Sequence, residues 1–205
     1  MRQADHNRRV WQDFEMKLRC AAHHEAGHVV IAAAQKLKLR PEGISVDASG
    51  CGLACYWKQL DASDLSRERV IVASLAGFKA EERLRKESSY PALDPLGVIL
   101  SPDAREAREQ ILKLSAGDIS NENPNSILAK LENRSECLVK VHWLAIQALA
   151  TALLDKDVEP LKPLKSGGTW SRENETTAKY VKGEEVVSIL ERYGIAAVCD
   201  PDVDT

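Results

Sequence analysis

Neither sign of charge dominates this sequence, and no apolar run in it is long enough to cross a membrane as a helix. Its 205 residues include 28 lysines and arginines against 31 aspartates and glutamates, which gives a net charge of −3. This balance provides no electrostatic reason to expect binding to nucleic acid or to an anionic membrane surface. Residues 138–154 form an apolar stretch of 17 residues, but Lys140, His142, Gln147 and Thr151 interrupt it. The stretch is therefore predicted to be a buried core helix rather than a membrane span, and His142 a histidine of the core or its rim.

A disulfide framework is also lacking. The five cysteines are odd in number and scattered along the chain (Cys20, Cys51, Cys55, Cys137 and Cys199). The first ten residues have no apolar segment typical of a signal peptide, so the sequence predicts a reducing, cytoplasmic setting. Cys51 and Cys55 could form half of a zinc site, but no second cysteine pair or nearby histidine completes it. We interpret both as small hydrophobic residues.

The most informative stretch is residues 21–30, because His24-Glu25-Ala26-Gly27-His28 matches the pattern H-E-x-x-H within a segment predicted to be helical. Residues four apart lie on the same face of a helix, so the imidazoles of His24 and His28 can converge on one cation. Zinc accepts two imidazole nitrogens and a carboxylate, and a catalytic site leaves a fourth position for water. Glu25, at the edge of that face, is placed to act as the general base for an attacking water.

The residues that follow the motif favour a buried site. Residues 29–34 are small or aliphatic, which suits the dry flank that a catalytic zinc helix needs. The alternative is a chance match in a helix that merely carries histidine and glutamate on its surface, because a five-residue motif has a real rate of false matches.

The rest of the chain predicts a mainly helical fold with a small β-hairpin. A helix is predicted over residues 11–39 and ends at Pro41-Glu42-Gly43; another is predicted over 63–86, a third starts at Ser101-Pro102-Asp103, and a short one covers 183–190. Residues 90–101 and 162–179 are predicted to be loops, the latter mobile, 115–124 a polar connector and 199–205 an acidic tail. The length allows one sizeable core, so a single domain is predicted over 1–205, with its core at about 11–192.

The predicted hairpin joins residues 44–46 to a strand that contains Gly52, Leu53, Ala54, Cys55 and Tyr56. If this hairpin lies beside the zinc helix, the exposed edge of its second strand can pair with the extended backbone of a substrate. The alternative is a packing hairpin without a binding role, and the sequence does not separate the two.

Taken in order, these segments resemble the peptidase domain of the FtsH family, the M41 zinc metallopeptidases. Four of them carry the resemblance: residues 22–30 are similar to A-Y-H-E-A-G-H-A, 52–57 to a short strand, 75–82 to L-G-G-R-x-A-E-E, and 101–104 to S-N-D-L. Residues 149–154 and 183–186 are similar to the closing helices of the family, so the resemblance covers about 15–192. The H-E-x-x-H pattern alone occurs in many unrelated zinc enzymes, whereas the ordered set is far more specific.

The resemblance implies a mainly α-helical, zincin-like peptidase domain with a small sheet and a zinc ion held by two histidines and a distant aspartate. Carried over by position, the ligands are His24, His28 and Asp103, with Glu25 as the catalytic base. Glu81 and Glu82 lie in a matching segment and compete for the role of third ligand. Alternatively, they orient a ligand histidine through the ring nitrogen that does not bind the metal.

Several positions depart from the family pattern: His23 replaces an aromatic residue, Phe78 an arginine and Pro102 an asparagine. These changes concern the rim of the site more than the zinc ligands. The sequence also has no G-x-x-x-x-G-K-[ST] box, so it lacks the family's ATPase machinery.

We therefore expect a soluble, zinc-dependent peptidase that cleaves unfolded or flexible polypeptides without ATP. Its expected partner is the polypeptide substrate, and a homo-oligomer or a separate ATPase partner is compatible with the sequence. The main alternative is a degenerate peptidase fold that serves as a zinc-stabilised interaction module, and a helical bundle without metal is the third hypothesis.

Overall fold

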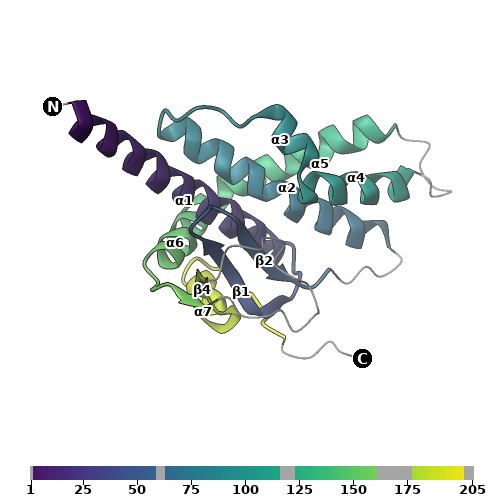
Figure 1. Ribbon diagram of the computed structural model, residues 1–205. Helices are drawn as coiled ribbons and strands as arrows, with labels where there is room; N and C mark the ends of the chain where they lie inside the picture. The colour runs from purple at the N-terminus through teal and green to yellow at the C-terminus, as the bar shows by residue number, and fades with distance from the viewer. Residues whose placement is uncertain (1, 59–62, 116–122, 161–176, 201–205) are drawn as a thin grey trace.

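A computed structural model describes residues 2–58, 63–115, 123–160 and 177–200, with side chains from residue 12 onward. The fold is mainly helical with a small four-stranded antiparallel sheet, as the sequence predicts (Figure 1). Its elements are α1 (Arg2–Ala34), β1 (Leu39–Asp47), β2 (Gly52–Tyr56), α2 (Asp64–Glu87), α3 (Pro95–Leu100), α4 (Pro102–Ser115), α5 (Pro124–Val141), α6 (Trp143–Leu154), β3 (Glu159–Pro160), β4 (Thr177–Val181) and α7 (Gly183–Glu191).

The C-terminal half of α1 lies at the centre of the molecule. It packs against α2 and α5 on one side and against α6 and the β1–β2 hairpin on the other, while its N-terminal turns project away from the rest of the chain (Figure 1). Val30, Ile31 and Ala32 of this half have no exposed surface. The prediction of a buried aliphatic flank after the motif is therefore confirmed.

α1 ends earlier than the sequence suggests. The predicted stop at residues 41–43 is wrong, because Lys36 adopts a left-handed backbone conformation with φ of 64° just after Ala34. The amide of Leu37 then donates to the carbonyl of Ala32, which is the bonding expected of a helix that closes through a left-handed residue. Pro41 and Gly43 instead lie inside β1, where the pairing with β2 shifts between Leu39 and Ile44.

The predicted hairpin is confirmed, and β2 forms one edge of the sheet, whose order is β2-β1-β4-β3. Asp47 builds the turn, since its carboxylate accepts hydrogen bonds from the amides of Ser49 and Cys51 at 2.8 and 2.9 Å. Gly50 completes the turn with φ of 82°, a conformation that favours glycine. This turn carries the chain directly to Gly52, the first residue of β2.

The other half of the sheet comes from the C-terminal region. Thr177–Val181 forms β4, which pairs with β1, so the predicted loop at 162–179 is wrong at its last three positions. Its other positions, 162–176, lie outside the described residues, as do 116–122 of the predicted connector and 201–205 of the predicted tail. Cys199 forms a parallel bridge with Leu39, and α7 confirms the predicted last helix.

α2 runs close to α1 because small residues meet at the crossing. A Cβ atom added to Gly27 would lie 2.7 Å from the Cβ of Ala80 and 2.8 Å from the carbonyl oxygen of Ala76. α2 begins at Ser63, whose side chain accepts from the amide of Ser66, as expected of an N-cap. The prediction of a second long helix over residues 63–86 is confirmed.

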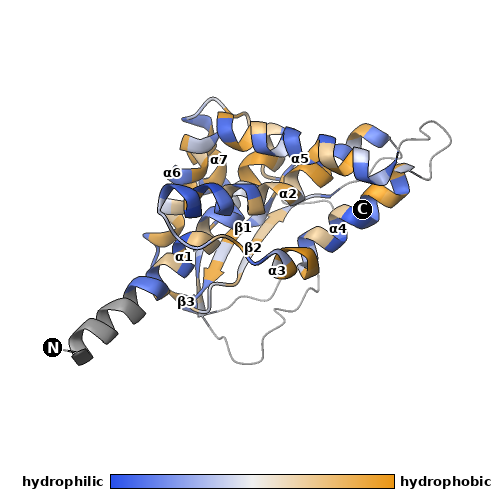
Figure 2. Cartoon of the chain, turned by 90° about the horizontal axis from the view of Figure 1, so that it is seen from above, coloured by the Kyte–Doolittle hydropathy of each residue, from blue (hydrophilic) through white to orange (hydrophobic). Residues whose placement is uncertain are grey.

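The predicted loop at 90–101 contains a short helix. α3 begins with Asp94 as N-cap and Pro95 at its first position, the same combination that starts α4 at Ser101 and Pro102. The apolar side chains of α3 are largely exposed, and Figure 2 shows this apolar helix beside α4. The predicted start of α4 is confirmed, and the amide of Ala104 donates to Ser101 Oγ at 3.1 Å.

The apolar stretch at 138–154 is not one continuous helix, which corrects the prediction. α5 and α6 meet at His142 and are bent by 73° relative to each other. The buried residues of α6 belong to the hydrophobic core. Among the described residues, no single helix is both long and apolar enough to cross a membrane. Only α5 and α6 taken together pass that test of length and composition.

Candidate metal centre

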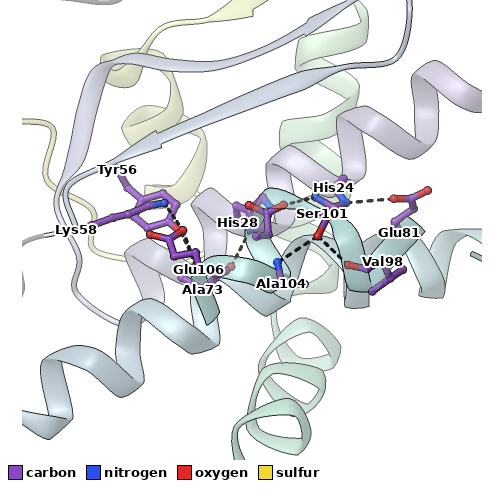
Figure 3. Close-up of polar contacts among 12 residues, drawn as sticks. His24, His28, Tyr56, Lys58, Ala73, Glu81, Val98, Ser101, Ala104 and Glu106 are labelled. Carbon is purple, nitrogen blue, oxygen red and sulfur yellow. Dashed lines mark hydrogen bonds and ion pairs between the residues drawn. The ribbon is translucent and has the colours of Figure 1, made fainter. Parts of the chain in front are cut away.

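Three side chains from two helices converge: His24 and His28 from α1, which Figure 3 labels, and Asp103 from the first turn of α4. The Asp103 Oδ2 atom lies 3.3 Å from His24 Nε2 and 3.4 Å from His28 Nε2. One ligand atom from each residue lies within 4.8 Å of the other two. In the part of the chain that the structure describes, this is the one group of histidine, cysteine and acidic residues close enough to hold a metal ion.

Each histidine is oriented through its other ring nitrogen. His28 Nδ1 lies 2.8 Å from the carbonyl oxygen of Ala73, and His24 Nδ1 lies 3.1 Å from Glu81 Oε2 (Figure 3). A carbonyl oxygen can only accept, so we assign the Nδ1 proton to His28, and by the same reasoning to His24 beside the carboxylate. Both Nε2 atoms then face Asp103, which is the arrangement found in histidines that bind metals.

The two distances to Asp103 Oδ2 suit ligands arranged around a tetrahedral metal ion. Ligands at about 2.0 to 2.2 Å from zinc, separated by a tetrahedral angle, lie about 3.4 Å from one another. Both observed distances to Asp103 Oδ2 agree with that value. His28 Nε2 is moreover buried without a hydrogen-bond partner, because its contact with Asp103 lacks hydrogen-bond alignment. A buried polar atom without a partner is costly, and a bound cation would satisfy it.

The electrostatics of the group also favour a cation. Burial lowers the pKa of His24, but hydrogen bonds to Asp103 and Glu81 outweigh this effect and raise it to about 10. Burial alone would raise the pKa of Asp103, but the contacts of its carboxylate with the His24 and His28 imidazoles hold that pKa well below the usual range. Two carboxylates thus stabilise positive charge at His24, and binding of a metal there must displace a proton.

Glu25 lies buried between α1 and the start of β2. A Cβ atom added to Gly52 would lie within 2.6 Å of three atoms of the Glu25 side chain, so only glycine leaves room for this carboxylate. Burial raises the pKa of Glu25, against the opposing influence of His24 and His28. The structure therefore brings the predicted base, the two histidines and the predicted substrate strand together.

The residues that replace the family pattern lie in different places. Phe78 packs edge-on against His24, with ring centroids 4.8 Å apart, so it contacts the candidate centre. Pro102 occupies the first position of α4, directly before Asp103. His23 points elsewhere: it lies 5.6 Å from the Trp143 ring, and its Nδ1 donates to the carbonyl of Arg19. The expectation that His23 alters the rim of the site is therefore wrong.

Gly77 of α2 is part of the geometry of the candidate site. A Cβ atom at this position would lie within 2.7 Å of three imidazole atoms of His24 and His28. The glycine in this segment of α2 thus makes room for both rings. A small residue four positions before Glu81 in a predicted helix was the available signal, but its meaning depends on the tertiary contact.

The two glutamates on α2 behave differently. Glu81 is buried, contacts His24 through Oε2 and accepts from Arg85 through Oε1, while the carboxylate of Glu82 is mostly exposed and lies 3.5 Å from Lys79 Nζ. Burial favours the neutral form of Glu81, yet its hydrogen bond with His24 and its contact with Arg85 lower its pKa. The structure brings Glu81 to the site and leaves Glu82 on the surface.

A cavity of about 270 Å³ opens beside His24 and Glu25. Its walls come from α1, the hairpin turn and α2, and they combine small residues with charged ones (Lys17, Cys20, Ala21, His24, Glu25, Ser49, Gly50, Glu81 and Arg85). A group bound in the cavity would lie next to the candidate base and one of the candidate ligands. Cys51 and Cys55 belong to no such group of potential ligands among the described residues.

No protein-family model matches this sequence, and a search of curated proteins finds no match. The arguments for function accordingly rest on the residues and the geometry described above.

Proposed function

We propose that this chain is a zinc-dependent metallopeptidase of the FtsH (M41) type that hydrolyses peptide bonds in unfolded or flexible polypeptides. The observation that carries the proposal is the convergence of His24, His28 and Asp103, with His28 Nε2 buried and lacking a hydrogen bond. Zinc is the metal that best suits two imidazoles and one carboxylate in a site with room for a further ligand.

Each residue has a role that its surroundings support. A zinc ion held by His24, His28 and Asp103 would polarise the scissile carbonyl and activate water as a Lewis acid. Glu25 would accept the proton of the attacking water and pass it to the leaving amine. Its raised pKa makes Glu25 a stronger proton acceptor than an exposed carboxylate, provided that it is ionised. Glu81 and the Ala73 carbonyl hold the two imidazoles in place.

The β2 edge is the proposed place for the substrate backbone. Among the strands that the structure describes, β2 pairs only with β1, and its first residue, Gly52, lies against Glu25. An extended peptide that added a strand at this edge would use main-chain hydrogen bonds, which depend little on sequence. The candidate substrate residues from Gly52 to Tyr56 would then position the scissile bond beside the base.

This proposal includes independence from ATP. Opening a stable domain costs about 5 to 15 kcal/mol, so only a very small fraction of a folded substrate presents an extended segment at any moment. The sequence has no phosphate-binding loop of the G-x-x-x-x-G-K-[ST] type with which to drive unfolding. We therefore expect cleavage of flexible chains alone.

The test uses protein purified without added zinc, followed by metal analysis and by incubation with casein and with one tightly folded domain, each with and without ATP. We expect one zinc per chain, cleavage of casein by the wild type, no cleavage by Glu25→Gln, survival of the folded domain, and no effect of ATP.

The opposite outcomes are informative. Protein that holds no zinc would favour a helical bundle without metal. One zinc per chain without any cleavage would favour the zinc-stabilised interaction module. Rapid loss of the folded domain, or stimulation of this chain alone by ATP, would contradict the proposed lack of an unfolding activity.

A further inference from the structure

Arg85 makes an unusually complete set of contacts next to the candidate metal centre. Its Nε and Nη2 atoms lie 2.8 and 2.7 Å from Glu81 Oε1, and its Nη1 donates to the carbonyl of Pro91 at 2.8 Å. Its guanidinium also lies 5.0 Å from the centre of the Tyr90 ring. All three nitrogens are engaged, although the side chain lies in the wall of a cavity.

These contacts form a chain that reaches His24. The Oε1 atom of Glu81 faces Arg85, and its Oε2 atom faces His24 Nδ1, so the two oxygens connect the guanidinium with the imidazole. The Glu81 side chain is only 11% exposed and the Arg85 side chain 16%. A carboxylate this deeply buried loses much of its hydration, and a guanidinium paired with one of its oxygens both compensates that loss and restricts the orientation of the carboxylate.

Arg85 also connects two parts of the candidate site along the chain. Pro91 lies in the segment that leads through α3 to Asp103, whereas Glu81 lies on α2. One guanidinium therefore anchors both the helix that orients His24 and the segment that approaches the third ligand. This double anchoring distinguishes Arg85 from an arginine that merely pairs with a surface carboxylate.

Binding of a substrate anion is a less favourable role for Arg85. Its donors are already directed at Glu81 and Pro91, and Glu81 neutralises its charge. An incoming carboxylate would have to displace these contacts and leave Glu81 buried without its cation.

We propose that Arg85 is a positioning residue for the metal centre: it fixes the Glu81 carboxylate, which in turn orients the His24 imidazole for metal binding. The inference rests on the proposed function, because it needs His24 to be a metal ligand. Removing Arg85 would leave Glu81 free to rotate or to bind water, and His24 would then sample orientations that do not bind metal.

The chain offers a matched control on the same helix. Arg83 Nε donates to Glu87 at 2.8 Å, four residues along α2, and its guanidinium lies 4.5 Å from the centre of the Trp143 ring. Arg83 and Arg85 thus share a residue type, a helix, an ion pair with a glutamate and a contact with an aromatic ring. Of the two glutamates, Glu81 contacts a candidate ligand.

The experiment measures zinc affinity by competition with a chelator, and the visible absorption of cobalt-loaded protein, for wild type, Arg85→Gln, Arg85→Lys and Arg83→Gln. We expect Arg85→Gln to weaken zinc binding about 10-fold, at the low end of the loss that partners of metal ligands cause. The cobalt absorption bands should change in position or intensity. Arg83→Gln should match the wild type in both measurements, and Arg85→Lys, which keeps the charge, should fall between wild type and Arg85→Gln.

The outcomes separate this inference from the proposed function. Wild type that binds neither metal would contradict the proposed function itself. Wild type that binds zinc, together with Arg85→Gln and Arg85→Lys proteins that bind it as tightly as Arg83→Gln and give the same cobalt spectrum, would overturn the role of Arg85 alone. If Arg85→Gln fails to fold, the comparison of Arg85→Lys with Arg83→Gln decides, because Arg85→Lys keeps a positive charge beside the Glu81 carboxylate.

Discussion

Two faces of α1 carry buried histidines that behave in opposite ways. His24 lies between Asp103 and Glu81, and its pKa is raised to about 10. His23, the preceding residue, points to a different side of α1 and lies against Trp143, and burial lowers its pKa, although its Nδ1 bonds to the carbonyl of Arg19. Burial is common to both residues. What distinguishes the candidate metal face is the presence of carboxylates from α2 and α4, so acidic partners rather than buried imidazoles define the site.

The largest effect is expected of a variant that loses hydrolysis but keeps the zinc ion. Glu25→Gln preserves shape but removes the basic carboxylate, so we expect hydrolysis to fall by about 10² to 10⁴-fold, the usual contribution of a general base. Zinc content should stay at the wild-type level, because Glu25 is not among the converging ligand atoms. Casein cleavage and metal analysis on the same preparation measure both. Turnover within a few-fold of wild type would remove Glu25 from this role.

Replacement of the distant ligand should destroy the metal face itself. Asp103→Ala leaves two imidazoles and no carboxylate ligand, so we expect zinc affinity to fall by more than about 100-fold, beyond the loss typical of residues that only support a ligand. Competition with a chelator measures the affinity. An Asp103→Ala protein that retained wild-type affinity would show that another residue supplies the third ligand.

The two neighbouring glutamates on α2 provide an internal comparison. Glu81→Ala removes the partner of His24 Nδ1, and we expect zinc affinity to fall by about 10 to 100-fold. Glu82→Ala removes a mostly exposed carboxylate near Lys79 and should leave the affinity unchanged. Equal affinities in the two variants would contradict the orienting role of Glu81.

Substitution of His23, which lies on the side of α1 that faces Trp143, should leave zinc binding almost unaffected. His23→Phe restores the aromatic residue of the family pattern beside Trp143 and costs one hydrogen bond to the Arg19 carbonyl. We expect wild-type zinc affinity and a loss of stability of about 1 kcal/mol, the typical net value of such a bond. Chemical denaturation and the chelator assay measure these. A large loss of zinc would show that the two faces are coupled.

His142, at the bend between α5 and α6, extends the comparison to pH. Burial lowers its pKa in the folded state, so protonation favours unfolding. Above the pKa of the unfolded state, near 6.5, His142 is neutral in both states and the proton has no effect on stability. As the pH falls from there through the lower pKa of the folded state, protonation of the unfolded state destabilises the fold. His142→Gln should therefore lose slightly less stability than wild type between pH 7 and pH 5. Parallel denaturation curves at each pH would show the difference, and an identical pH dependence would contradict it.

The sequence predicts the part of the site that one helix builds. A spacing of four residues brings His24 and His28 together on any helix, whatever surrounds it. Asp103 lies 79 residues after His24, and only the family resemblance and the Ser-Pro start of α4 pointed to it. The fit of Glu25 against Gly52 and of the imidazoles against Gly77 depends on how the hairpin and α2 pack on α1, which no local pattern encodes.

The fold shows the same division between local and tertiary signals. The hairpin, α2 and the start of α4 follow from local turn and capping residues, and they are confirmed. The predicted end of α1 was wrong because Lys36, a residue type without a turn preference, adopts the left-handed backbone conformation. β4 was missed because Thr177-Ala178-Lys179 continues a polar segment, and its strand character becomes clear only against β1. The bend at His142 involves neither proline nor glycine.

Gly52 and Gly77 have a consequence for how variation in this chain should be interpreted. Neither residue has a side chain that could donate a proton or bind a metal, yet each leaves free the space that Glu25 or the His24 and His28 imidazoles fill. In a saturation-mutagenesis experiment scored by activity, even alanine at these positions should be rejected as strongly as a change to a ligand. Intolerance to substitution at Gly52 and Gly77 would therefore outline the candidate site as clearly as intolerance at its candidate ligands.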